Sequence, residues 1–324
     1  MRRSTEPADF RFAILSLSLA LLATALPLRA EDAEPAPSAP PAPPPYSVPF
    51  TLRPVFAVNV VRFDSAIASY QNSAGATGGL VTASVLTFSK KVTPDWSLLA
   101  RSALITNAPP TGAATASPNF SNPLIGTTYS IALPSSFRLG LFGAVALSVG
   151  TGGGNTPDAA HASANAAAIL GRSAMDNALF AVNYSTAIVG AGLAYISNGL
   201  TLQAEATVLH LMRARGETVD VDPARTNFTT GFLAGYEFVP SWIVETELRY
   251  QRWLNNPTVF AAAAPATQNL SFAIGPRFTF KSGGLTMRPA ISYAQGLVGP
   301  IAGPGFSSGT NSDRIVHLDF PIFF

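Results

Sequence analysis

The last twelve residues of the chain, 313–324, alternate between two kinds of side chain. After Arg314 the even positions are apolar, and they end on Phe324. Asp313, His317 and Asp319 fall on the opposite face of an extended strand, because successive side chains of a strand point to opposite sides. A strand with one apolar face and one ionisable face suits a wall between lipid and water.

This closing strand resembles the last strand of Gram-negative outer-membrane β-barrels, which also ends in an aromatic residue. The resemblance implies that Phe320, Ile322 and Phe324 belong to the signal read by the barrel-insertion machinery. It further implies that outer-membrane lipid surrounds the protein. No narrower family is matched by these residues.

The N-terminus has the order of a secretory signal peptide. Arg2 and Arg3 precede an apolar run over residues 12–26, and Ala30 is a small residue suited to cleavage. The apolar run is shorter than the about 20 residues that a spanning helix needs. We therefore expect residues 1–30 to be removed. The chain has no cysteine, so it has neither a lipid-modified cysteine nor a disulfide framework.

Removal of the signal peptide would also remove the basic excess of the chain. The full chain has 20 Lys and Arg against 18 Asp and Glu, and residues 1–30 hold four arginines and two acidic residues. The remainder is balanced at 16 of each, which argues against a nucleic-acid partner. Hydrophobic residues make up 48% of the chain, yet no later apolar run is long enough for a spanning helix. Many short strands with one lipid-facing side would explain both facts.

Residues 31–49 are dominated by proline and alanine. Such a segment is expected to be extended and to bury nothing. We predict a periplasmic linker that offers no folded plug, with a proline-rich docking peptide as the alternative. Residues 50–324 then form the membrane domain.

From residue 50 onward, two-residue alternation recurs between turn sequences. It is clearest over residues 242–254 and 270–281; in the former, aromatic residues lie near both ends of the apolar face. We expect twelve strands, at residues 50–63, 79–91, 96–106, 121–133, 137–149, 186–197, 200–215, 226–239, 242–254, 270–281, 285–296 and 313–324.

Short and long connections alternate between these strands. The short ones include Asn198-Gly199, a tight-turn sequence, and they are assigned to the periplasm together with both termini. The long ones fall at 64–78, 107–120, 150–185, 214–225, 255–268 and 297–312. The sequence therefore predicts an all-β, antiparallel, up-and-down transmembrane barrel, with ten or fourteen strands as alternatives. A soluble β-sandwich would also alternate, but it explains neither the terminal aromatic residue nor the asymmetry of the connections.

The polar faces of the strands, projected inward, give the expected pore lining. Both charge signs are present, which fits either a pore for small solutes or ion pairs that hold neighbouring strands in register. The candidate lining residues are Arg53, Asn59, Arg101, Arg138, Gln203, Glu205, Arg213, Glu237, Glu245, Glu247, Arg249, Gln251, Arg277, Arg288, His317 and Asp319.

The longest connection, residues 150–185, contains a predicted helix. Thr156 and Pro157 suit the cap and the first helical position, and residues 159–170 favour a helix that Gly171 would end. Such a helix either folds into the mouth of the barrel or covers its rim. The rim position is slightly favoured.

His161 and Ser163 have the His-x-Ser spacing of outer-membrane phospholipases, a resemblance that covers only these two residues. In those enzymes the pair lies on a strand, where residues two apart share a face and the histidine can activate the serine. On a helix such residues diverge by about 200°, so the pair is not expected to meet. His210 is expected on the lipid face, and no histidine supports a metal site.

Three classes of function remain open. A narrow passive channel or transporter for small hydrophilic solutes, with the loop at residues 156–172 at its mouth, is favoured. A closed structural or surface-interaction barrel is the alternative, followed by a lipid hydrolase at the rim. Twelve strands should leave a narrow lumen, if any, between the filled barrels of eight strands and the wide channels of sixteen. No catalytic residue, cofactor or metal is expected, and the solute and the oligomeric state stay open.

Replacing the terminal aromatic residue tests the predicted insertion signal. Phe324→Ala should lower the amount of folded barrel in the outer membrane of expressing cells, because the closing strand would lose the residue read at insertion. Heat-modifiable mobility of the protein in the membrane fraction measures this amount. Phe306→Ala, in an expected outer loop, is the control, and equal amounts of folded barrel from both variants would contradict the prediction.

Overall fold

A computed structural model of the chain describes residues 46–71, 75–110, 117–255, 257–258, 267–298, 302–303, 306–307 and 314–324. All of them belong to one compact unit, Pro44–Phe324. The predicted signal peptide and residues 31–45 of the predicted linker lie outside the described residues.

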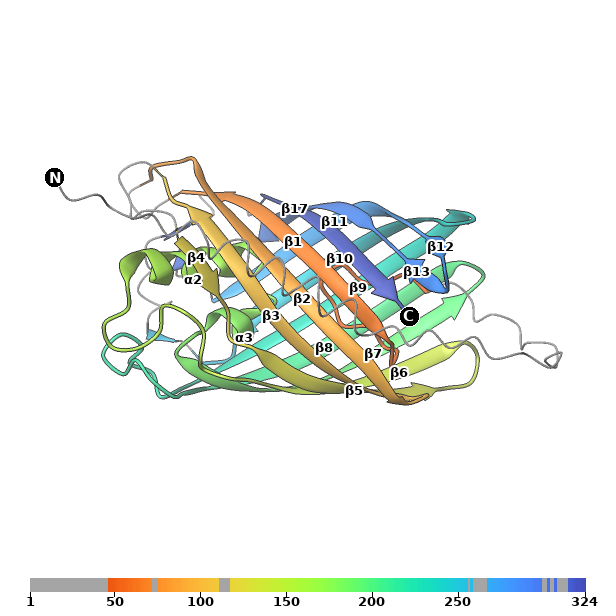
Figure 1. The fold of residues 1–324 in the computed structure, drawn as a ribbon, viewed down its shortest axis with the longest axis horizontal. Helices are drawn as coiled ribbons and strands as arrows, with labels where there is room; N and C mark the ends of the chain where they lie inside the picture. The colour runs from red at the N-terminus through yellow and green to blue at the C-terminus, as the bar shows by residue number, and fades with distance from the viewer. Residues whose placement is uncertain are drawn as a thin grey trace. The chain divides into compact units, whose positions relative to one another are not determined.

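The wall of the molecule is a closed antiparallel sheet (Figure 1). Within the described ranges, twelve strands pair in chain order: β1 (Val60–Tyr70), β2 (Gly79–Thr93), β3 (Trp96–Ala108), β5 (Leu124–Ala132), β6 (Phe137–Ala146), β7 (Tyr184–Ser197), β8 (Leu200–Arg213), β9 (Ala224–Val239), β10 (Trp242–Trp253), β11 (Gln268–Phe278), β14 (Ala290–Val298) and β17 (Arg314–Phe323). β1 then pairs with β17, so that Val60 lies opposite Phe323 and Ala68 opposite Ile315. The predicted twelve-stranded barrel is confirmed.

Shorter elements complete the unit. β4 (Ser117–Phe120) pairs with β3 beyond the end of β5. β12 (Phe280–Ser282) and β13 (Leu285–Met287) form a hairpin in which β13 also pairs with β17, and β15 (Ala302–Gly303) pairs with β16 (Phe306–Ser307). The helices within the described residues are α2 (Ala159–Gly171) and α3 (Asn177–Phe180). Neither of these two helices is long and apolar enough to cross a membrane.

The two ends of the barrel differ, as the alternation of connections predicts. One end carries the short turns and the end of β17, and we call it the turn end. The other carries α2 and α3, and we call it the loop end (Figure 1). At the turn between β7 and β8, Asn198 and Gly199 have φ of 49° and 78°, the left-handed conformation that a two-residue hairpin requires.

The wall is polar inside and apolar outside. On β10, Glu245, Glu247 and Arg249 are fully buried, whereas Val244 and Leu248 are each 41% exposed. Alternation therefore places the charged side chains in the lumen and the apolar ones on the outer surface. A soluble protein has the opposite arrangement, and this one suits hydrocarbon surroundings.

The first strand differs from the prediction. Residues 60–70 form β1, whereas a strand was predicted over residues 50–63. Asp64 marked the start of a predicted outer loop, but it lies mid-strand and is buried, because Arg172 neutralises it at 2.7 Å. The strand predicted over residues 121–133 starts later, as β5 at Leu124, because residues 121–123 connect β4 to β5.

A charge on the outer surface should destabilise the barrel according to its depth in the membrane. Leu248→Arg, in the middle of β10, should lower the free energy of unfolding by about 2–4 kcal/mol, because it places a guanidinium in hydrocarbon. Phe280→Arg, at the turn end, should cost only about 0–1 kcal/mol. Denaturant titration in lipid vesicles, followed by tryptophan fluorescence, measures both values. Equal costs would show that the outer surface does not face lipid.

Candidate functional site

The chain before β1 lies inside the barrel. We call residues 46–59 the inner segment. Phe50, Leu52 and Val55 in this segment are each only 1% exposed. Its first residues bond to the start of β8 at the turn end, and Asn59 meets Phe324 there again through a backbone hydrogen bond of 3.3 Å. The inner segment therefore enters the lumen from the turn end and returns to it.

Hydrogen bonds from wall side chains hold the backbone of the inner segment. The backbone N–H of Thr51 donates to both carboxylate oxygens of Glu247 at 3.1 Å. The carbonyl of Val48 accepts from Arg277 Nη2 at 2.7 Å. Irregular backbone that is buried in a barrel would otherwise leave N–H and C=O groups unpaired, at a cost in free energy. These hydrogen bonds remove part of that cost.

Arg53 provides the main ionic contact of the inner segment. Its Nη1 lies 2.6 Å from Glu205 Oε1 and donates to Thr207 Oγ1 at 3.1 Å. Its carbonyl accepts from Gln203 Nε2 at 2.7 Å. Two lumen-facing residues of β8 that were predicted as pore lining, Gln203 and Glu205, therefore bind the inner segment.

Glycines in the wall make room for the inner segment. A Cβ atom at Gly140 would lie 2.7 Å from the Cα of Val55, and one at Gly231 would lie 2.5 Å from a methyl group of Leu52. Both distances are shorter than carbon atoms tolerate in van der Waals contact. The wall is therefore shaped to receive the inner segment.

The connection between β6 and β7, residues 147–183, enters the lumen from the loop end, and we call it the long loop. It contains α2, whose Ala164, Ala167 and Ala168 are fully buried. A Cβ at the last residue of α2, Gly171, would be in ordinary contact, 3.7 Å, with Ala83 and Val81 of β2. The sequence slightly favours a position over the rim for this helix, and that prediction is wrong. α2 has no Lys, Arg, Asp or Glu, and it packs against the inside of the wall.

A tight turn after α2 is fixed by ion pairs. Arg172 lies 2.7 Å from Asp64 of β1 and 3.1 Å from Asp176, and Arg101 of β3 binds both oxygens of Asp176 at 3.0 and 3.2 Å. The turn residue Ser173 has φ of 48°, which is costly outside glycine. The ion pairs hold the turn in this conformation.

The pKa of Asp176 shows the strength of this ionic contact. Burial alone would raise the pKa, but the guanidinium groups of Arg101 and Arg172 hold it well below its usual range. A lowered carboxyl pKa contributes stability that is lost only as the pH falls through the folded-state value. The ion pairs of the turn therefore persist in mildly acidic solution.

The inner segment and the long loop meet in the barrel. Leu52 of the inner segment, Met175 of the long loop and Leu233 of β9 form one buried cluster. The two parts thus occupy the lumen from opposite ends and meet within it.

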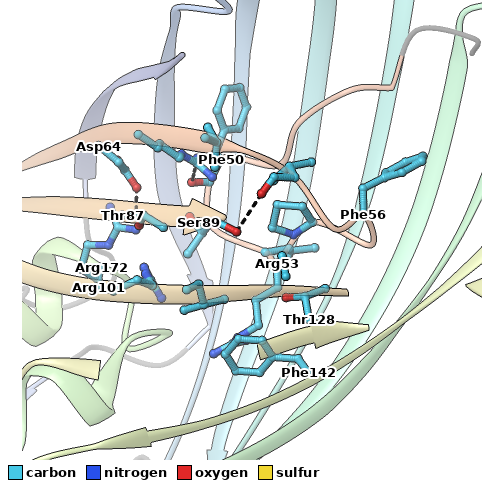
Figure 2. A pocket seen from close by; sticks show the side chains of 18 residues that line it. Phe50, Arg53, Phe56, Asp64, Thr87, Ser89, Arg101, Thr128, Phe142 and Arg172 are labelled. Carbon is cyan, nitrogen blue, oxygen red and sulfur yellow. Dashed lines mark hydrogen bonds and ion pairs between the residues drawn. The ribbon is translucent and has the colours of Figure 1, made fainter. Parts of the chain in front are cut away.

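A cavity of about 70 Å³ remains between the inner segment and the wall of β1, β2, β3, β5 and β6 (Figure 2). In Figure 2, Arg53 and Phe56 of the inner segment lie beside the strands that carry Ser89 and Thr128. Arg101 and Arg172 line the same cavity. It has room for water-sized molecules only.

Six of the residues predicted as pore lining form two buried groups in the lumen. Arg277 lies 3.0 Å from Glu245 and 2.9 Å from Asp319, while Arg249 lies 2.7 Å from Glu247 and 3.5 Å from His317. Gln251 is also buried. No described group of three or more acidic or histidine residues could hold a metal ion.

Other predicted residues lie near the ends of the barrel or on the inner segment. Arg138 stacks on Phe56, and Arg288 donates to the carbonyl of Tyr46 at 2.6 Å. Arg213 binds loop carbonyls at the loop end, and Glu237 accepts from the N–H of Ser241 at the turn end. Arg53 and Asn59 lie on the inner segment and not on a wall strand.

Two expectations about the chain before β1 are wrong for the described residues. Residues 46–49 are buried, although the predicted linker was expected to bury nothing, and residues 50–59 are not part of a strand. Pro49 and Pro54 interrupt the strand pattern, and the aromatic and aliphatic residues between Tyr46 and Phe56 favour burial.

Sequence reasoning missed Arg62, Asp64, Arg172 and Asp176. Arg62 binds Asp319 at 2.6 Å and the carbonyls of Pro49 and Phe50. Arg172 and Asp176 could have been found from the sequence, because they are four residues apart and directly follow a predicted helix that has no charged residue.

His161 and Ser163 lie on α2, as predicted, and bond to different strands. His161 Nδ1 pairs with the side chain of Asn119, and Ser163 Oγ accepts from Asn107 Nδ2 at 3.3 Å. These contacts tie α2 to β4 and β3. The predicted cap of this helix is displaced by two residues, because Asp158 and not Thr156 accepts from the first backbone N–H groups.

No protein-family profile and no curated protein matches the chain. Among solved structures, the COG4313 outer membrane channel from Pseudomonas putida F1 is similar over 85% of this chain and 98% of that chain, with a TM-score of 0.52 and 9% identity. The KdgM porin in complex with disordered oligogalacturonate covers 81% of this chain, over 98% of its own, with a TM-score of 0.44 and 7% identity. The NanC porin covers 80%, over 98% of its own, with a TM-score of 0.44 and 9% identity. The likeness to the Pseudomonas putida channel shows that the chain has the fold of an outer-membrane β-barrel.

Removing Arg172 should free the long loop. Arg172→Gln leaves Asp64 and Asp176 buried without a full counter-charge, at a cost of about 3–5 kcal/mol. A protease that cuts after small residues, added to intact vesicles, should then cleave the alanine-rich α2 faster than in the wild type. Arg252→Gln, which removes an exposed arginine of β10, should not change the rate. Equal cleavage of Arg172→Gln and wild type would contradict the assigned anchor.

Proposed function

We propose that the protein is a narrow passive channel for small hydrophilic solutes in the outer membrane, and that its resting state is closed. The inner segment closes it from the turn end, which we assign to the periplasm, and the long loop closes it from the loop end. Solutes cross when one or both of these parts withdraw. Residues 1–30 serve as signal peptide, and Phe320, Ile322 and Phe324 contact the insertion machinery.

The observation that carries this proposal is what fills the lumen. A structurally closed small barrel is filled by the side chains of its own wall. Here the wall carries glycine where the inner segment lies, and the segment is held by hydrogen bonds and one ion pair. Withdrawal of the segment would uncover a polar lining that includes Gln203, Glu205 and Glu247.

A rim hydrolase is less well supported. Ser163 is bonded to Asn107 and His161 to Asn119, so the two side chains act as contacts between α2 and the wall. Activation of a serine requires that a base reach its hydroxyl group. We therefore propose no enzymatic activity.

A disulfide that locks the inner segment tests the proposed gating. The N–H of Ser47 donates to Thr201 Oγ1 at 3.0 Å, which makes Ser47→Cys/Thr201→Cys suited to a bridge, and the chain has no other cysteine. Single-channel conductance in planar bilayers should be absent in the oxidised double variant and return on reduction. Each single variant, treated in the same way, is the control.

A wedge provides the opposite test of the same gate. Gly140→Val puts a side chain where Val55 packs, and should raise the fraction of time in the conducting state. For the Ser47→Cys/Thr201→Cys variant, equal conductance in the oxidised and the reduced protein would contradict gating by the inner segment. Absence of conducting steps in every variant would contradict the channel itself and support the closed barrel.

A further inference from the structure

The inner segment is fastened unevenly to the wall. Its residues 46–53 donate hydrogen bonds to Thr201, Gln203 and Glu205 of β8 and to Glu247 of β10, and they accept one from Arg277 of β11. On the side of β2, β3 and β5, the hydrogen bonds of its described residues lie near the turn end: Ser89 donates to the carbonyl of Val58, and the N–H of Lys91 donates to Asn59 Oδ1. Arg62 of β1 also donates to the carbonyls of Pro49 and Phe50, and Val55 packs against Gly140 of β6. Most of the hydrogen bonds to the wall are still made to β8–β11, and the cavity of Figure 2 lies between the segment and β1, β2, β3, β5 and β6.

The wall of this cavity has the chemistry of a polar track. Thr87 and Ser89 of β2, Ser97 of β3 and Thr128 of β5 line it with hydroxyl groups. These residues lie on neighbouring strands, since Ser97 is opposite Thr128 and Thr87 is opposite Arg101 in the sheet register. The track extends from the turn end to the ion pairs of Arg101 and Arg172.

The charges that face the cavity are mostly positive. Arg53, Arg62, Arg101 and Arg172 line it, whereas Asp64 is the lining carboxylate. The partner carboxylates of the first three, Glu205, Asp319 and Asp176, are not part of the lining.

Two guanidinium nitrogens also keep unused donors. Arg172 Nη1 and Arg53 Nε are buried, and neither has a hydrogen-bond partner in the part of the chain that the structure describes. Arg172 as a whole is only 1% exposed. Such donors are costly unless an acceptor reaches them, and carboxylate oxygens accept strong, charge-assisted hydrogen bonds from guanidinium groups.

We infer that this cavity is the transit site of the channel, and that it takes small carboxylate anions. The site rests on the proposed channel function and adds to it a location, between the inner segment and β1–β6, and a solute class. Anions meet the unused donors of Arg53 and Arg172 on the way, while the hydroxyl groups of β2, β3 and β5 replace part of their hydration shell. While the inner segment is in place the cavity admits only water-sized molecules, so anions pass along this wall once the segment withdraws.

Cysteine modification tests the location. Thr128→Cys lies on the cavity, and Thr229→Cys is the matched control, a fully buried threonine of β9 on the opposite side of the lumen. A small negatively charged methanethiosulfonate reagent should lower the single-channel conductance of Thr128→Cys by about twofold or more and leave that of Thr229→Cys unchanged. Loss of conductance in Thr229→Cys but not in Thr128→Cys would overturn the location.

Reversal potentials test the solute class. Under a gradient of potassium acetate, wild-type channels should give a reversal potential whose sign shows that acetate is more permeant than potassium. A gradient of potassium chloride should give a reversal potential of the same sign. A potential of the opposite sign, or none, would overturn the carboxylate class. If the channels conduct but either of these two tests fails, the proposed channel function still stands and only the transit site is overturned. If no variant conducts, the channel function and the transit site are both overturned.

Discussion

Closure of the strand ring is the constraint on which the rest of this structure depends. In hydrocarbon every backbone N–H and C=O must find a partner, so β1 has to pair with β17 and leave no free edge. A ring of twelve strands encloses more space than the wall side chains fill. The inner segment and the long loop occupy that space, and each brings irregular backbone that needs partners of its own.

The buried charges follow from this arrangement. Charged side chains such as Glu247 and Arg277 have no access to solvent, and burying them would be costly without partners. In the inner segment the carbonyl of Val48 accepts a hydrogen bond from Arg277, and the N–H of Thr51 donates one to Glu247. Removing either filling part would expose these groups to water that enters the lumen. The structure and the proposed open state can therefore both satisfy the polar groups of the wall, as the proposed gate requires.

The sequence predicted the wall much better than its contents. Two-residue alternation sets which residues face lipid, so the strand number and lumen residues such as Glu245 and Arg249 could be predicted. The inner segment could not, because residues 50–59 alternate as a wall strand does. Asp64 shows the same limit. A charged residue at this place indicates an exposed loop, and only its ion pair with Arg172, 108 positions later in the chain, explains why it lies in a strand. Contacts of this kind depend on how far a loop folds back, which local pattern does not encode.

Hydrogen exchange of the backbone amides of residues 46–59, in the full chain in lipid vesicles, tests the central claim most directly. A segment that fills the lumen reversibly should exchange far more slowly than an unstructured peptide, yet faster than the amides of β8 and β10, which never leave the ring. Exchange as fast as in an unstructured peptide would show that the inner segment does not occupy the lumen. Exchange as slow as in the wall would show that it does not withdraw, and would contradict its role as a gate.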